Sequence, residues 1–152
     1  LLLLGSGSLE TEIQNRIALG GAEHQVHFAG QVEFARLPEM YRAADLYVSA
    51  SHSDGSSVSL LEAMACGLPA LVSDIPGNRE WVEPEVNGWW FRDRSGKDLA
   101  RLLRHAVSGA ADLPAMGRSS RRVAETRADW SVNSQELMRA YQLAATDGRA
   151  VG

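Results

Sequence analysis

The stretch from Ser51 to Ser73 constrains the fold of this chain more than any other part. It is a polar loop followed by an apolar helix, a Gly-x-Pro break and an apolar strand. Serine residues before the helix suit a helix N-terminus, because their hydroxyl oxygens accept hydrogen bonds from its free amides. Residues 60–66 are apolar except for Glu62, which predicts a buried helix that carries one carboxylate. The glycine and proline then end the helix, and residues 70–72 are predicted to form a strand.

Two carboxylates flank the start of this helix. Asp54 lies in the loop, and Glu62 follows it within the helix. Because a carboxylate in an apolar helix is costly unless it is paired or hydrogen-bonded, Glu62 is a candidate ligand-binding residue. The alternative is an ordinary glutamate on the surface of a helix. In α/β folds, anionic ligands bind where a strand leads into a helix N-terminus, so this segment is the candidate site.

Strand and helix signals alternate along the chain, which predicts an α/β fold with a doubly wound, parallel, Rossmann-like sheet. The opening apolar run is expected to be a buried strand that enters a tight turn. We expect one domain over residues 1–152, with a frayed tail at residues 145–152. The expected strands are 1–4, 24–28, 45–49, 70–72 and 87–91, and the expected helices are 9–19, 37–44, 60–66, 95–108, 116–127 and a last one from 130 through 141.

Gly5 and Gly7 invite comparison with a dinucleotide-binding fingerprint. The third glycine position of that motif is Glu10 here, and no second strand with an acidic end follows. We interpret the pair as a turn between a strand and a helix. Trp89 and Trp90 are adjacent on a predicted strand and therefore face opposite sides, one in the core and one partly exposed.

Composition narrows the class of function. The chain has 152 residues, a net charge of -4 and 45% hydrophobic residues, as in an ordinary globular domain. An acidic chain lacks the basic field that attracts nucleic acid, so the arginine-rich residues 118–127 are interpreted as a solvated helix face. The single Cys66 forms no internal disulfide and is interpreted as a small core residue, which favours a reducing, cytoplasmic setting. The run Leu1–Leu4 is too short to span a membrane.

The run from Asp54 to Pro69 resembles the signature of retaining glycosyltransferases of family 4, which have the GT-B fold. In that family an acidic residue, seven intervening positions and a glutamate precede A-M-A-x-G-x-P. Asp54 is a departure, because the family usually has a glutamate there, one methylene longer. The resemblance extends over most of the chain but covers only the C-terminal, donor-binding half of such an enzyme. The matching residues are Asp54, Glu62, Ala63, Met64, Ala65, Gly67 and Pro69.

The resemblance implies a role for each candidate residue. Glu62 would accept hydrogen bonds from the ribose hydroxyls of a nucleotide-sugar. Asp54 would lie near the donor sugar as the catalytic residue, where the matching residue of the family binds sugar hydroxyls. The alternative for Asp54 is a turn aspartate or a helix cap. Backbone atoms of Gly30, Gln31 and Val32 would meet the base, although an ordinary turn glycine explains Gly30 equally well. The diphosphate would rest on the helix N-terminus, which is formed by Gly55, Ser56, Ser57, Val58 and Ser59.

No metal or other cofactor is expected. The four histidines, His24, His27, His52 and His105, are scattered without the spacing of a metal site. A helix N-terminus supplies an alternative, metal-free way to stabilise a diphosphate.

The resemblance also implies what this chain needs from outside itself. It implies a UDP- or GDP-sugar as donor, an acceptor bound by an N-terminal domain, and a role in polysaccharide biosynthesis. The family's opening strand and helix, which carry an Arg and a Lys that grip the diphosphate, have no counterpart in this sequence. A different hypothesis is therefore a truncated or repurposed module that acts without catalysis, as a homodimer or with a partner chain. A GT-B sugar epimerase is a third hypothesis, against which the A-M-A-C-G-L-P context speaks.

Overall fold

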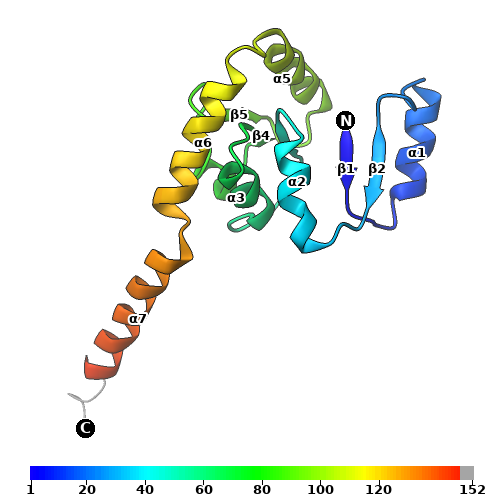
Figure 1. The fold of residues 1–152 in the computed structure, drawn as a ribbon. Coiled ribbons are helices and arrows are strands. Elements are labelled where there is room, and N and C mark those ends of the chain that lie inside the picture. Colours follow the sequence, from blue (N-terminus) through cyan, green and yellow to red (C-terminus); the bar gives the residue numbers. More distant parts are fainter. Residues whose placement is uncertain (148–152) are drawn as a thin grey trace. The chain divides into compact units, whose positions relative to one another are not determined.

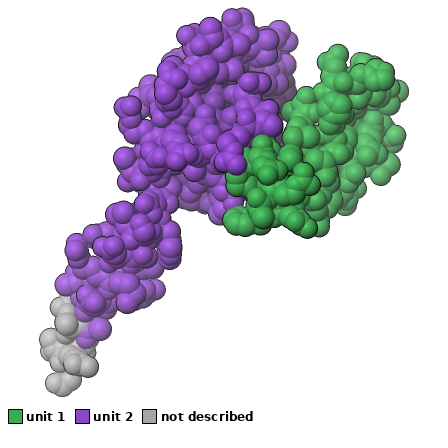
Figure 2. Space-filling view, in the orientation of Figure 1, with its two compact units in different colours: residues 1–40 green, residues 41–152 purple. Residues whose placement is uncertain are grey.

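The computed structural model describes residues 1–147, and the chain forms two compact units, residues 1–40 and residues 41–152 (Figure 2). The predicted tail begins within the last helix, and residues 148–152 lie outside the described residues. No helix among the described residues is both long enough and apolar enough to cross a membrane.

The first unit is built on a parallel pair of strands (Figure 1). Strand β1 (Leu2–Leu4) pairs with β2 (His27–Gly30), and helix α1 (Glu10–Leu19) connects them. A single 3-10 turn at Phe34–Arg36 then leads into α2 (Leu37–Arg42), which contains the boundary between the two units. The β-α-β order is the one predicted from the sequence.

The prediction that the first strand is buried is wrong. Leu1 is 67% exposed and Leu2 is 43% exposed, and no residue of the first forty falls in the buried class. Two strands joined by one short helix offer little surface against which the leucine side chains can pack. An apolar run alone therefore did not determine burial here.

The second unit is built on a three-stranded parallel sheet in the order β3-β4-β5. Its central strand, β4, has all of its residues buried, which explains why its sequence is continuously apolar rather than alternating. The register aligns Tyr47 with Ala70 and Ala70 with Gly88. The strands are β3 (Tyr47–Ser49), β4 (Ala70–Ser73) and β5 (Gly88–Phe91).

Helices cover both faces of this sheet, as predicted for a doubly wound fold. Ala70 and Val72 of β4 pack with Leu60 and Met64 of α3 and with α6, whereas Leu71 faces the opposite way and packs with α5. The two hydrophobic cores therefore lie on opposite sides of one strand. The helices are α3 (Val58–Ala65), α4 (Pro76–Arg79), α5 (Gly96–Ser108), α6 (Leu113–Arg127) and α7 (Trp130–Asp147).

Two details of the core differ from expectation, and one agrees. The helix predicted over residues 60–66 is not buried all round, because Ala65 is exposed and Leu61 and Cys66 are only half-buried. Trp89 is 6% exposed and Trp90 is half-buried, as their adjacent positions on β5 predict. The helix packs through one face, and its N-terminal turn stays open to solvent.

Candidate functional site

The candidate site lies at one edge of the three-stranded sheet. Because β3, β4 and β5 are parallel, their carboxyl ends meet at the same edge. The loop that follows β3 runs along this edge and leads into α3. Strand β4 ends at Ser73 and β5 ends at Phe91, so the segments that follow these two residues start at the same edge of the sheet.

Helix α3 begins with free backbone donors. Ser57 is the N-cap residue, and its side chain does not bond a backbone amide of the helix. Its hydroxyl instead lies 3.2 Å from the Ser59 hydroxyl, which in turn lies 2.8 Å from the Tyr47 hydroxyl. Among the described residues, no acceptor is bonded to the amides of Val58 or Leu60, which belong to the first turn. Such a helix terminus can bind an anion.

Glu62 lies one turn further along α3 and is half-buried. The Tyr41 hydroxyl donates a hydrogen bond to Glu62 Oε2 at 3.0 Å. Tyr41 is itself buried, and its pKa is raised by burial first and then by the bond to Glu62 and the charge of that carboxylate. The phenol therefore stays neutral and serves as a donor. No motif in the sequence marks Tyr41, so this contact was not predicted.

The loop before α3 is held by backbone contacts. Gly77 of α4 lies so close that a Cβ atom there would be 1.9 Å from the Gly55 carbonyl oxygen and 2.6 Å from that of Asp54. The buried Ser73 hydroxyl donates to the Ser51 carbonyl, and Asn78 Nδ2 donates to the Ser73 carbonyl at 2.8 Å. These contacts fix the backbone of the loop that carries Asp54.

A side-chain pair ties the same loop to the end of β5. His52 Nδ1 lies 2.5 Å from Asp93 Oδ1. The hydrogen bond to His52 lowers the pKa of Asp93, with a smaller contribution from Arg94. No sequence pattern indicates this pair, because its members are far apart along the chain and His52 belongs to no recognisable metal or catalytic spacing.

Asp54 presents a free carboxylate. It is exposed, and among the described residues no hydrogen bond or ion pair is made to its side chain. Gly55 and Ser56 beside it are exposed as well. The loop backbone is therefore fixed while the carboxylate remains available to a ligand.

The structure brings together every predicted site residue that belongs to the second unit, in one loop and one helix. The other predicted residues, Gly30, Gln31 and Val32, lie at the end of β2 in the first unit. There the Gly30 carbonyl accepts a hydrogen bond from the Gly5 amide at 2.7 Å, and Gln31 donates to the Ser6 hydroxyl at 3.3 Å. Gly30 has a φ of 63°, which favours glycine for reasons of backbone geometry alone.

Helices α3 and α6 enclose a groove that includes part of the candidate site. Its volume is 470 Å³, and Arg121, which lines it, donates a hydrogen bond to the Ala65 carbonyl at 2.7 Å. Among the described residues, no three histidine, cysteine or acidic side chains cluster closely enough to hold a metal ion. The groove is lined by Val58, Leu61, Glu62, Ala65, Arg121, Ala124, Glu125, Ala128 and Asp129.

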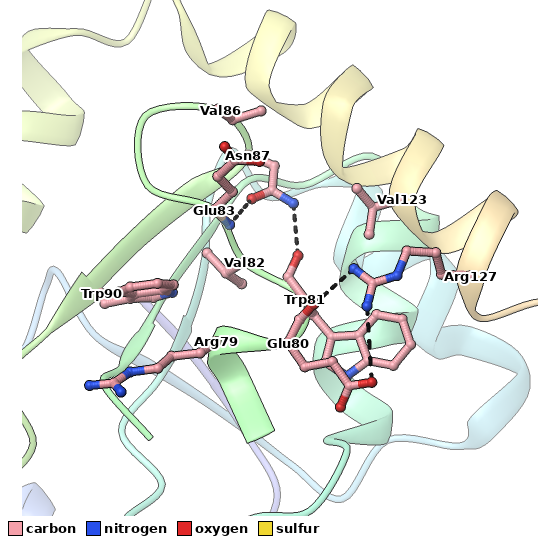
Figure 3. Close-up of a pocket in the computed structure, with 10 residues that line it drawn as sticks. All are labelled: Arg79, Glu80, Trp81, Val82, Glu83, Val86, Asn87, Trp90, Val123 and Arg127. Carbon is pink, nitrogen blue, oxygen red and sulfur yellow. Dashed lines mark hydrogen bonds and ion pairs between the residues drawn. The ribbon is translucent and has the colours of Figure 1, made fainter. Parts of the chain in front are cut away.

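A second pocket, of 290 Å³, lies beside α4 and α6 (Figure 3). The Arg127 guanidinium lies 4.9 Å from the ring centre of Trp81 and donates to the Glu80 carbonyl at 2.8 Å. The Arg79 guanidinium lies 5.7 Å from the ring centre of Trp90. None of the described residues around this pocket is a predicted donor-binding residue. Arg127 thus joins α6 to the segment after α4 through the Trp81 ring and the main-chain carbonyl of Glu80.

The structure is a Rossmann-like α/β fold with an open helix N-terminus at the carboxyl edge of its three-stranded parallel sheet. The family described as glycosyl transferases group 1 matches residues 1–124. The chain belongs to this family and corresponds to the C-terminal part of its GT-B members.

Individual relatives agree with this assignment. The phosphatidyl-myo-inositol mannosyltransferase of Mycobacterium leprae is 32% identical over 99% of this chain and 40% of its own length. Sucrose-phosphate synthase from Thermosynechococcus elongatus superposes with a TM-score of 0.87 at 25% identity, over 96% of this chain and 39% of that one. Anabaena HepE, solved in complex with UDP, superposes with a TM-score of 0.85 at 23% identity, over 93% and 40%. This chain thus spans about two fifths of the length of each of these three proteins.

Proposed function

We propose that this chain is the donor-binding half of a retaining glycosyltransferase that uses a nucleotide-diphosphate sugar, UDP- or GDP-linked. The observation that carries the proposal is the open N-terminus of α3, placed at the carboxyl edge of the sheet with Glu62 one turn away. Free amides suit a diphosphate, and a carboxylate suits ribose hydroxyls. Membership of the glycosyl transferase family supports this reading of the site.

Each residue receives a role in the proposed reaction. The amides of Val58 and Ser59 take up the negative charge that develops on the diphosphate as its bond to the anomeric carbon breaks. Glu62 orients the donor through its ribose. Asp54 lies beside the donor sugar as the proposed catalytic residue, where its carboxylate accepts hydrogen bonds from the sugar hydroxyls, and the close approach of Gly77 holds the loop that carries it. A helix terminus serves here in place of a metal ion. Gly55, Ser56 and Ser57 complete the donor-binding set of the second unit.

The acceptor is proposed to bind outside this chain, because the chain spans only about two fifths of the length of its relatives. Among the solved neighbours, HepE was crystallised with UDP-glucose, which supports a UDP-sugar as the first donor to test. We expect the chain alone to bind nucleotide and to transfer sugar at a negligible rate. Sugar transfer by the isolated chain at an ordinary enzymatic rate would contradict the proposal that the acceptor binds outside this chain.

The test is a calorimetric titration of the folded chain with UDP, GDP and UDP-glucose, with Glu62→Ala alongside. We expect saturable binding of one nucleotide class and a loss of about tenfold or more in Glu62→Ala, because a hydrogen bond to a charged group is removed. The matched control is Glu136→Ala, an exposed glutamate on α7. The absence of binding by every nucleotide favours the alternative, a module that acts through a partner chain or as a homodimer.

A further inference from the structure

The phenol of Tyr41 holds Glu62 from a different part of the chain. Tyr41 is 8% exposed and lies near the end of α2, before the sheet strand β3. Its hydroxyl donates to Glu62 Oε2 at 3.0 Å. A glutamate side chain has several rotatable bonds, and fixing it costs conformational entropy. The bond to a buried, immobile phenol restricts that freedom before any ligand arrives.

The same bond determines which partners the carboxylate can still accept. Oε2 already receives the phenol proton, whereas no described residue bonds to Oε1. An ionised carboxylate accepts hydrogen bonds and donates none. Any ligand group that completes its hydrogen bonding must therefore be a donor, and a hydroxyl is the donor that a nucleotide's ribose offers.

A second tyrosine supports the adjacent turn in the same way. The Tyr47 and Ser59 hydroxyls lie 2.8 Å apart, and Ser59 is three residues before Glu62, on the same face of α3. The rings of Tyr41 and Tyr47 lie 6.4 Å apart at 57°. The two phenols thus contact the two polar side chains on one face of α3. Only the Tyr41 bond involves the carboxylate.

We infer that Tyr41 is a positioning residue that holds Glu62 in the orientation that receives the ribose hydroxyls, so that the site selects ribonucleotides over nucleotides that lack these hydroxyls. The inference rests on the proposed donor-binding function. It adds a specificity determinant on α2, outside the loop and helix that carry the donor-site motif. Tyr41 acts through Glu62 and does not itself touch the donor.

The experiment compares two ligands that differ only at the ribose. The full chain and Tyr41→Phe are titrated with UDP and with 2′,3′-dideoxyuridine diphosphate, or with the GDP pair where wild type prefers guanine. We expect wild type to bind the ribonucleotide at least about tenfold more tightly, since a hydrogen bond to a charged group is lost in the dideoxy ligand. In Tyr41→Phe this ratio falls toward one, because the affinity for UDP drops and the affinity for the dideoxy ligand does not.

Controls separate positioning from a general loss of structure. A merely destabilised protein binds both ligands less well and keeps the ratio. Tyr47→Phe removes a phenol hydroxyl that contacts Ser59 and not Glu62, so we expect it to keep the ratio as well. In a Glu62→Gln background, Tyr41→Phe should change the ratio much less, because the two residues act as one unit.

The outcomes distinguish the two claims. A ratio in Tyr41→Phe equal to that of wild type, with Glu62→Ala still weakening UDP, overturns the inference and leaves the proposed function standing. Failure of folded wild type to bind any nucleotide overturns both. Equal affinity of wild type for UDP and the dideoxy ligand also overturns the inference, because the site then does not select for ribose.

Discussion

Tyr41 and Glu62 show how burial and charge act together on one side chain. Burial disfavours the charged phenolate, and the neighbouring carboxylate disfavours it further, so both effects raise the pKa of Tyr41 above its ordinary value of 10.0. A raised pKa in the folded state means that the neutral phenol stabilises the fold. That stabilisation is fully present below the ordinary pKa and is lost as the pH rises toward the pKa of the folded state.

The first prediction concerns this pair. Replacing Glu62 by Gln removes the negative charge while keeping the shape, so the pKa of Tyr41 should fall but remain above the ordinary value because burial persists. Phenolate absorbance in an alkaline titration measures this pKa. The part of the titration curve that disappears in Tyr41→Phe belongs to Tyr41. An unchanged titration in Glu62→Gln would show that the hydrogen bond does not form in solution.

At the scale of elements, the site depends on how closely α4 approaches the loop after β3. A Cβ atom on Gly77 would lie 1.9 Å from the Gly55 carbonyl oxygen, which no side chain tolerates. The loop backbone and α4 therefore fit together only with glycine at that position. The same loop is also held by the Ser73 hydroxyl, which donates a hydrogen bond to the Ser51 carbonyl, and Asn78 in turn donates to the Ser73 carbonyl. The glycine that this close packing requires therefore also determines where the loop places Asp54.

We predict that Gly77→Ala displaces the loop. Overpacking of this kind costs about 1–3 kcal/mol in free energy of unfolding, and donor binding should weaken more than stability alone explains. Urea denaturation and nucleotide titration measure the two effects. Gly96→Ala is the matched control, because a Cβ atom there meets nothing within 4 Å. If both variants retain wild-type stability and affinity, the close approach does not exist in solution.

Much of this architecture was predictable from the sequence, and the exceptions have physical causes. The β4 strand, the amphipathic α5 and the order of elements follow from apolar patterning, which the local chain carries by itself. The exposure of β1 and of one face of α3 depends on which surfaces later segments cover, and local patterning does not contain that information. The Tyr41–Glu62 and His52–Asp93 contacts join residues far apart in the chain and left no motif.

At the scale of the whole chain, the two units differ in how much they bury. The second unit contains both hydrophobic cores, whereas no residue of the first forty is classed as buried. Few buried apolar contacts give a low local stability. The chain is therefore expected to open first in its N-terminal unit while the three-stranded sheet stays intact.

Hydrogen exchange tests this difference. The backbone amides of β1 and β2 should exchange well before those of β4, whose residues are all buried. Exchange followed by mass spectrometry or NMR at neutral pH resolves the two sheets. Equal protection in both sheets would contradict the expectation and would mean that the two units unfold as one.

The measurement that tests the central claim most directly is the mapping of UDP and GDP onto the chain by NMR. The account predicts that the nucleotide that binds shifts the amides of Val58, Ser59 and Leu60 at the start of α3, and that Glu62→Ala greatly weakens this response. Shifts confined to the pocket around Trp81 and Trp90 would contradict it, as would a folded chain whose α3 amides do not respond to either nucleotide.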